Sequence, residues 1–183
     1  HLLFTGSESR HSRNLWDRIA KGNPTLGEIA HVNFGKQLRD RSRFKSDVIE
    51  VRHLRDVKGI YRPCYTGRDV LRYDLHWNRL ACLNNDVAQC GGCWDGDKQD
   101  AKNKLITRQI GRHPEFAIDR LGYQCLNTVF MINVKGSAIH PLALLGILNS
   151  TLIRAFWLDR FYDGRRTFPK IKGTYLKLLP ICL

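Results

Sequence analysis

Two segments rich in arginine and lysine carry the side chains best suited to bind a polyanion. The first spans residues 36–45 (KQLRDRSRFK) and the second spans residues 165–172 (RRTFPKIK). Arginine and lysine bind phosphate oxygens through charged hydrogen bonds, and arginine also reads guanine bidentately in the major groove. Each segment contains one phenylalanine, Phe44 or Phe168, whose ring can pack against a base or a sugar. Either segment alone also fits a solvated charged surface, but the two together favour contact with DNA.

The residues predicted to contact DNA are polar or basic side chains of these two segments, with two further arginines. Gln37 is included because glutamine can pair bidentately with adenine. Arg68 lies in a turn-rich stretch, and Arg108 lies in a predicted strand whose polar side chains face solvent or DNA phosphates. The full set is Lys36, Gln37, Arg39, Arg41, Arg43, Arg68, Arg108, Arg165, Arg166, Thr167, Lys170 and Lys172.

One pattern is compatible with a metal. Cys90-Gly91-Gly92-Cys93 places two thiols at a spacing that can bind one zinc ion, but structural zinc needs four ligands and no second pair has matching spacing. A redox pair is a second interpretation. We favour the third, in which Cys90 and Cys93 are loop residues without a bound metal.

Motifs that carry catalysis are missing from the sequence. There is no His-Glu-x-x-His, no Gly-x-Ser-x-Gly and no phosphate-binding Gly-x-x-x-x-Gly-Lys-Ser/Thr. Asp40 with Glu50-Val51-Arg52 approaches a metal-dependent nuclease pattern, but arginine stands where lysine is needed. The stretch Phe4-Thr5-Gly6-Ser7-Glu8 approaches a cofactor loop for S-adenosylmethionine, but Glu8 replaces its glycine. We therefore predict no catalytic residue and no cofactor site in this chain.

Charge and hydropathy narrow the class of partner. Thirty Lys and Arg against seventeen Asp and Glu give a formal net charge of +13, which attracts nucleic acid. No apolar run reaches the ~20 residues that span a bilayer, so no membrane partner is expected. The six cysteines lack the spacing of a disulfide scaffold and indicate a reducing cytoplasm. Because the chain begins without Met, we expect it to be a piece of a longer protein.

The elements that would position these residues form a mixed pattern. Strands are predicted over residues 26–34, 48–51, 79–83, 105–110, 116–119 and 126–134. Helices are predicted over residues 12–21 and 141–162. The last two strands are expected to form a hairpin that turns at residues 120–122. The predicted fold is a single α+β domain with a twisted, mostly antiparallel sheet and one long helix in its C-terminal half. Residues 1–22 are expected to be a linker or helical lead-in, and residues 23–183 the DNA-recognition domain.

Six short segments together carry a family resemblance. They are LGEIAHVNFG (26–35), YRP (61–63), TGRDVLRY (66–73), KLITRQIG (104–111), LGILNS (145–150) and LLPI (178–181). Their order and spacing resemble the TaqI-like C-terminal specificity domain of adenine-N6 DNA methyltransferases and type IIG restriction-modification enzymes.

The resemblance implies a role rather than a set of base-reading residues. It implies sequence-specific binding of duplex DNA, which positions the DNA for a separate, upstream methyltransferase domain. It further implies that S-adenosylmethionine binds in that domain, that the fragment itself is not an enzyme, and that the protein works in the cytoplasm of a bacterium or archaeon. The parent protein is expected to be an adenine-N6 methyltransferase that can also carry endonuclease activity.

A metal-dependent nuclease fragment remains as one alternative, and two functions of other classes remain beside it. An RNA-binding module would stack bases on aromatic side chains such as Tyr73, Tyr123 or Phe130. A scaffold domain would use the helix over residues 141–162 as its contact face, although the stripe of Leu145, Leu152, Phe156 and Trp157 fits a core better.

Overall fold

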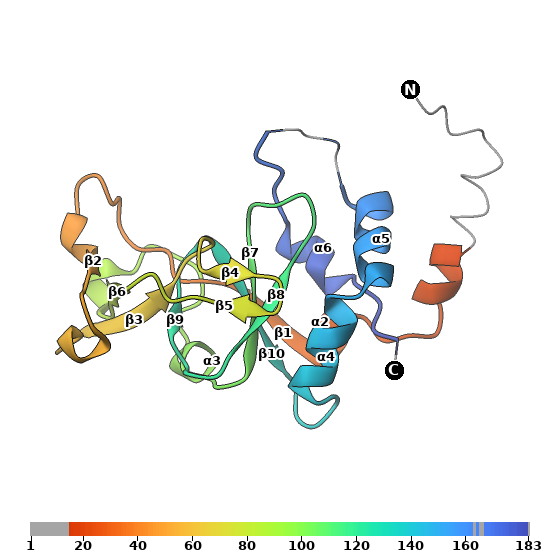
Figure 1. Ribbon diagram of the computed structural model, residues 1–183, viewed down its shortest axis with the longest axis horizontal. Coiled ribbons are helices and arrows are strands. Elements are labelled where there is room, and N and C mark those ends of the chain that lie inside the picture. The colour runs from red at the N-terminus through yellow and green to blue at the C-terminus, as the bar shows by residue number, and fades with distance from the viewer. Residues whose placement is uncertain (1–14, 163, 165–166, 183) are drawn as a thin grey trace.

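Four antiparallel strands form the central sheet of the computed structural model, which describes residues 15–162, 164 and 167–182 (Figure 1). In the order of the sheet they are β1 (Ala30–Phe34), β10 (Val129–Val134), β7 (Lys104–Arg108) and β8 (Phe116–Asp119). The structure confirms the predicted α+β class with mostly antiparallel pairing. Three of these strands lie inside or at the predicted ranges, whereas the predicted strand over residues 26–34 begins with a helical turn.

The central sheet is buried on both faces, which explains its continuous apolar runs. Successive side chains of a strand point to opposite faces. Phe130 and Ile132 of β10 pack into the larger core with the helices, while Val129 and Met131 pack into a second cluster on the opposite face. Both faces therefore contribute hydrophobic burial, and β10 contains no solvent-facing position between residues 129 and 132.

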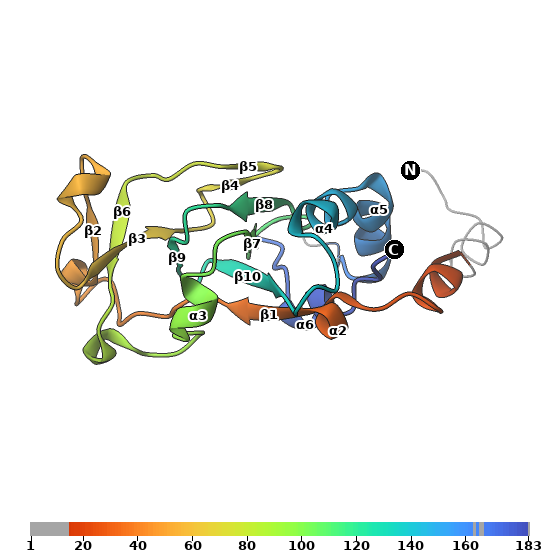
Figure 2. The ribbon, with the colours of Figure 1, turned by 90° about the horizontal axis from the view of Figure 1, so that it is seen from below.

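Helices cover one side of this sheet. They are α2 (Leu26–Ile29), α4 (Pro141–Leu148), α5 (Thr151–Arg160), α6 (Gly173–Lys177) and a helical stretch over residues 15–20. Figures 1 and 2 both place α4, α5 and α6 on one side of the sheet and the second sheet on the other.

The predicted single helix over residues 141–162 is wrong. The axes of α4 and α5 differ by 54°. The Ser150 hydroxyl accepts a hydrogen bond from Ile153 N at 3.2 Å and so begins a new helix. The Asn149 side chain turns into the sheet, where it accepts from Phe116 N at 2.9 Å and donates to Phe116 O at 2.8 Å.

A smaller sheet extends the molecule on the other side. Its strands, in order, are β2 (Val48–Glu50), β6 (Leu80–Leu83), β3 (Tyr61–Tyr65) and β9 (Gln124–Cys125). The pairing of β3 with β9 is parallel, and the other two pairings are antiparallel. The hairpin of β4 (Val70–Leu71) and β5 (Asp74–Leu75), the short helix α3 (Gly96–Gln99) and three 3-10 turns, η1 (Lys45–Asp47), η2 (Leu54–Asp56) and η3 (Asp86–Ala88), complete the described fold.

The hairpin predicted at residues 120–122 is also wrong. β8 pairs with β7, and the turn after it leads into β9 of the other sheet. Asp119 shapes this turn because its Oδ1 accepts from Leu121 N and Gly122 N, while its Oδ2 accepts from the buried ammonium of Lys104 on β7.

The chain crosses between the sheets at residues 35–37. Gly35 passes so close to the neighbouring backbone that a Cβ there would lie 2.2 Å from Leu126 O. Lys36 N donates to Cys125 O at 2.7 Å, and Gln37 N donates to Gly91 O at 2.9 Å. This crossing fixes where the first basic segment emerges from the core.

Within the described residues, no single helix is long and apolar enough to cross a membrane. The bent pair of α4 and α5, taken together, meets the same criterion by length and composition alone.

Candidate nucleic-acid interface

A groove of about 1130 Å³ brings together predicted site residues from distant parts of the chain. Its walls come from residues 37–41, from residues 66–68 with 70–71, from Arg108 with Ile110, and from residues 126–128, with Glu50, Leu80 and Cys90. Five residues predicted to contact DNA line it: Gln37, Arg39, Arg41, Arg68 and Arg108. The first two wall segments are contributed by the loop before β2 and the turn after β3, and the third by the end of β7.

Two of the four groove arginines are held by carboxylates. Arg39 donates to buried Asp47 through Nε at 3.0 Å and Nη2 at 2.6 Å, and its guanidinium lies 4.0 Å from the ring centroid of Phe44. The Asp47 hydrogen bonds raise the pKa of Arg39 above its ordinary value. Arg108 donates from Nη2 to Glu115 at 2.6 Å. These contacts fix the two guanidinium groups in place.

The other two groove arginines are unpaired. Arg41 and Arg68 are exposed, and neither makes an ion pair or side-chain hydrogen bond with any residue in the described part of the chain. Asp40 and Glu50 also line the groove, but the Asp40 carboxylate accepts from the backbone and hydroxyl of Ser42, which lowers the pKa of Asp40. Among the described residues, Arg41 and Arg68 are thus the groove arginines without a protein counter-ion.

Lys36 requires a correction. Its side chain is 2% exposed, with the ammonium donating to Asn84 Oδ1 and lying 4.6 Å from the ring centroid of Trp94. Burial lowers the pKa of Lys36. Lys36 therefore supports the fold beneath the groove instead of reaching a phosphate, and Arg43, which is exposed but does not line the groove, stays a predicted contact.

The described part of the second basic segment lies beside the groove. Gly111 N donates to Pro169 O at 3.0 Å, Ile171 N donates to Gln109 O at 2.8 Å, and Lys170 pairs with Ile110, which lines the groove. Figure 1 shows this segment (blue) beside the loop that follows β7 (green).

The individual side chains of this segment differ in their contacts. Thr167 and Lys170 are exposed, and Lys172 is exposed with its ammonium 5.0 Å from the ring centroid of Tyr175. Arg165 and Arg166 lie outside the described residues.

The cysteine loop packs against the crossing strand. Cys90 N donates to Gln37 O at 3.0 Å and Cys93 N donates to Phe34 O at 2.9 Å. Gly92 has φ +72°, and a Cβ there would lie 2.0 Å from Gly35 O, so the glycine allows this close approach. No group of three or more potential metal ligands occurs among residues 15–162, 164 and 167–182.

Sequence reasoning missed three uncharged polar residues of the groove. Thr66, Asn127 and Thr128 line the groove, and Gly67 N donates to Thr128 Oγ1 at 2.9 Å. Buried Asp69 holds the turn by accepting from Thr66 N at 2.6 Å and Thr66 Oγ1 at 2.7 Å. The Thr-x-x-Asp spacing of this turn is the signal that could have drawn attention to it.

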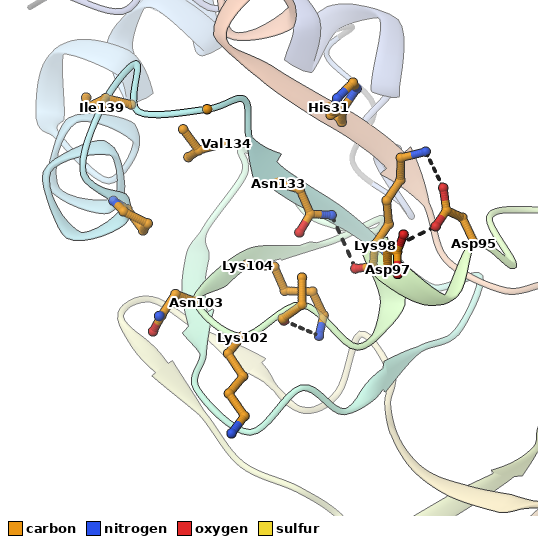
Figure 3. Close-up of a pocket in the computed structure, with 13 residues that line it drawn as sticks. His31, Asp95, Asp97, Lys98, Lys102, Asn103, Lys104, Asn133, Val134 and Ile139 are labelled. Carbon is orange, nitrogen blue, oxygen red and sulfur yellow. Dashed lines mark hydrogen bonds and ion pairs between the residues drawn. The ribbon is translucent and has the colours of Figure 1, made fainter.

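A second, smaller pocket of about 470 Å³ contains none of the predicted DNA contacts. It lies at the Lys104 end of β7, away from Arg108 (Figure 3). Its charges are largely satisfied within the fold, because Lys98 pairs with Asp95 at 2.6 Å and Lys104 pairs with Asp119. The Asn133 amide donates to Lys98 O at 3.3 Å.

The residues invoked by the alternative functions are mostly internal. Tyr123 and Phe130 are buried, whereas Tyr73 is 49% exposed. Leu145, Phe156 and Trp157 are buried in the larger core as predicted, but Leu152 is 40% exposed and does not belong to that stripe.

A similar solved structure supports the fold. A chain from the study "Structural basis underlying complex assembly and conformational transition of the type I R-M system" aligns with a TM-score of 0.50 at 12% identity, over 96% of this chain and 43% of that one. The HsdS subunit from Thermoanaerobacter tengcongensis aligns with a TM-score of 0.46 at 11% identity, over 96% of this chain and 42% of the subunit. The chain thus spans less than half the length of either.

No curated protein matches this sequence. The family model of the TaqI-like C-terminal specificity domain matches residues 62–181, which is more than half of the chain and includes the turn after β3, the end of β7 and helices α4 to α6. The match confirms the family resemblance, and all of the sequence segments that carry it except the one over residues 26–35 lie within or at the edge of the matched range. The chain belongs to the TaqI-like C-terminal specificity domain family.

Proposed function

We propose that this chain binds duplex DNA in the arginine-lined groove and acts as the target-recognition domain of a restriction-modification methyltransferase. The observation that carries the proposal is the convergence of Arg39, Arg41, Arg68 and Arg108 on one groove from three separate segments. Membership of a specificity-domain family supports the same role.

The arrangement suggests a division of labour among these arginines. Arg39 and Arg108 are fixed by carboxylates, so their remaining donors have defined directions, as base or phosphate recognition requires. Arg41 and Arg68 have no counter-ion among the described residues, so a DNA phosphate would supply one. Gln37, Arg43, Thr167, Lys170 and Lys172, together with Arg165 and Arg166, remain proposed contacts around this centre.

The catalytic step would belong to another part of the protein. The family supports a parent adenine-N6 methyltransferase whose upstream domain binds S-adenosylmethionine, while this chain holds the DNA. No residue of this chain is proposed to hold the cofactor, and we propose that the parent can also carry endonuclease activity.

The first prediction separates groove binding from general attraction by net charge. The double variant R41A/R68A and the matched double variant K102A/R120A both remove two positive charges. Lys102 and Arg120 are exposed and lie at the Lys104 end of β7, away from the groove. Fluorescence anisotropy with a mixed-sequence duplex would measure affinity as a function of salt for both variants.

Only R41A/R68A should weaken binding and flatten the salt dependence. The slope of log affinity against log salt falls by roughly 0.9 per lost phosphate contact, so two contacts predict a decrease of about 1.8. Equal slopes for the two variants would show that the groove is not the binding surface. Tighter binding of single-stranded RNA than of duplex in competition would favour the RNA-binding alternative.

A further inference from the structure

Phe168 is the most exposed large apolar side chain in the described part of the chain. Its side chain is 70% exposed, and its backbone φ is +50°. A bulky residue rarely adopts this left-handed conformation, and such strain persists only where neighbouring structure maintains it. Exposure and strain together mark Phe168 as a residue placed for contact with something outside the chain.

The residues after Phe168 provide the structure that maintains this conformation. Pro169 O accepts from Gly111 N, Lys170 pairs with Ile110, and Ile171 is 1% exposed within the larger core. Phe168 is therefore presented immediately before a firmly anchored stretch. That stretch is joined to the end of β7, whose Arg108 lines the groove.

The other phenylalanine of the basic segments is engaged within the protein. The guanidinium of Arg39 lies 4.0 Å from the ring centroid of Phe44, so one face of that ring is covered. Phe168 makes no such contact with a ring or a cation among the described residues. Among the described residues, a cation therefore covers the ring of Phe44 and none covers the ring of Phe168.

We propose that Phe168 inserts its ring at a base step of the bound duplex. Exposed Lys170 and Lys172 follow it in the sequence and would meet phosphates, while the apolar ring would leave water by packing against base faces. Apolar side chains of DNA-bending proteins act as wedges in this way, partly unstacking the step that they enter. The inference rests on the proposed function and adds to it one residue that contacts bases without reading their hydrogen-bonding edges.

The test places a fluorescent probe at the ring itself, so the preferred DNA sequence need not be known. In the variant F168W, an added mixed-sequence duplex should quench the emission of the new indole relative to the wild-type protein, because the indole stacks on bases. The control L121W introduces the same group at a site that is 59% exposed, on the turn after β8 at the far end of β7. The duplex should leave its emission unchanged.

A second variant separates insertion from charge. F168A should weaken binding by at least about fivefold through loss of stacking, with an unchanged salt slope because no phosphate contact is lost. Duplex binding by F168W without quenching, or equal quenching of L121W, would overturn the insertion alone. Failure of the wild-type protein to bind duplex would overturn the proposed function and this inference with it.

Discussion

Lys36 and Arg41 belong to the same basic segment, but only Arg41 reaches solvent. Lys36 N is bonded to Cys125 O at the crossing between the sheets, and its buried side chain reaches Asn84 and Trp94. Arg41 follows the crossing, on the exposed part of the loop. The two cations should therefore contribute to different properties, one to the fold and the other to binding.

This difference predicts the behaviour of Lys36→Met. Methionine has a similar length and removes a buried charge, while the Asn84 hydrogen bond and the Trp94 contact are lost. The free energy of unfolding, measured in urea, should change by only about 1 kcal/mol, because replacing a buried charge by an apolar group often costs little. The salt slope of duplex binding should equal that of the wild-type protein.

The matched comparison is Arg41→Ala, which removes one exposed charge from the same segment. It should reduce the salt slope by roughly 0.9 without changing the free energy of unfolding. A reduced slope for Lys36→Met would mean that the Lys36 ammonium contacts DNA after all.

Residue types predicted which arginines line the groove, but they did not predict which basic side chain is buried beneath it. Charge and loop or turn placement selected Arg39, Arg41 and Arg68, and outward alternation on a predicted strand selected Arg108; the fold brings all four together. The same criteria selected Lys36, because they report a preference for solvent and carry no information on the close crossing at Gly35. Long-range backbone contacts decide which basic side chain is covered.

At the scale of elements, the break between α4 and α5 shows a similar limit. The apolar stripe over residues 141–162 is periodic enough to predict one helix. Ser150, however, is a good N-cap, and Asn149 has partners on β8 that only the folded sheet provides. The local sequence therefore allowed both outcomes, and the tertiary hydrogen bonds of Asn149 selected the bend.

Asn149→Ala tests this explanation. The substitution leaves Phe116 N, in the interior, without its acceptor, whereas Phe116 O keeps the hydrogen bond from Tyr73 N at 2.8 Å. An unsatisfied buried donor costs about 1–3 kcal/mol, so the free energy of unfolding in urea should fall by about that amount.

Two further variants calibrate that result. Ser150→Ala should cost about 1 kcal/mol through loss of the cap, and Thr174→Ala on the exposed face of α6 should change little. If Asn149→Ala were as mild as Thr174→Ala, the side-chain bonds to Phe116 would not be what bends the helix pair.

The local sequence pattern predicted the positions of individual strands. It did not predict which strands pair, because pairing joins residues that are distant in the sequence. The residues of β8 were predicted with the observed bounds, but its partner was not. β8 joins β7 through a register that places Lys104 opposite Asp119, an ion pair in which both side chains are fully buried. A short turn signal at residues 120–122 suggested a hairpin, and a contact between distant residues overrode it.

For the whole molecule, the family match beginning at residue 62 does not mark where the folding unit begins. β1 pairs with β10 over five residues, from Ala30 to Phe34. Leu26 N donates to Leu179 O, and Ile181 N donates to Pro24 O, both at 2.8 Å. The segment before residue 62 therefore supplies an edge of the central sheet and holds the C-terminal end of the chain.

Two truncations should consequently behave differently. A fragment of residues 62–183 leaves β10 without β1 and uncovers Phe130 and Ile132, so it should show no cooperative unfolding in urea.

A fragment of residues 23–183 keeps both sheets and loses only the helix over residues 15–20 with what precedes it. In that helix Trp16 is buried against Phe156, with ring centroids 5.7 Å apart. Losing this burial should lower the free energy of unfolding by about 2–3 kcal/mol and leave the transition cooperative. Because the groove is lined only by residues after 36, the longer fragment should also bind duplex DNA with the salt slope of the full chain. Cooperative unfolding of the 62–183 fragment would show that β1 is dispensable, and an unfolded 23–183 fragment would place residues 1–22 inside the domain.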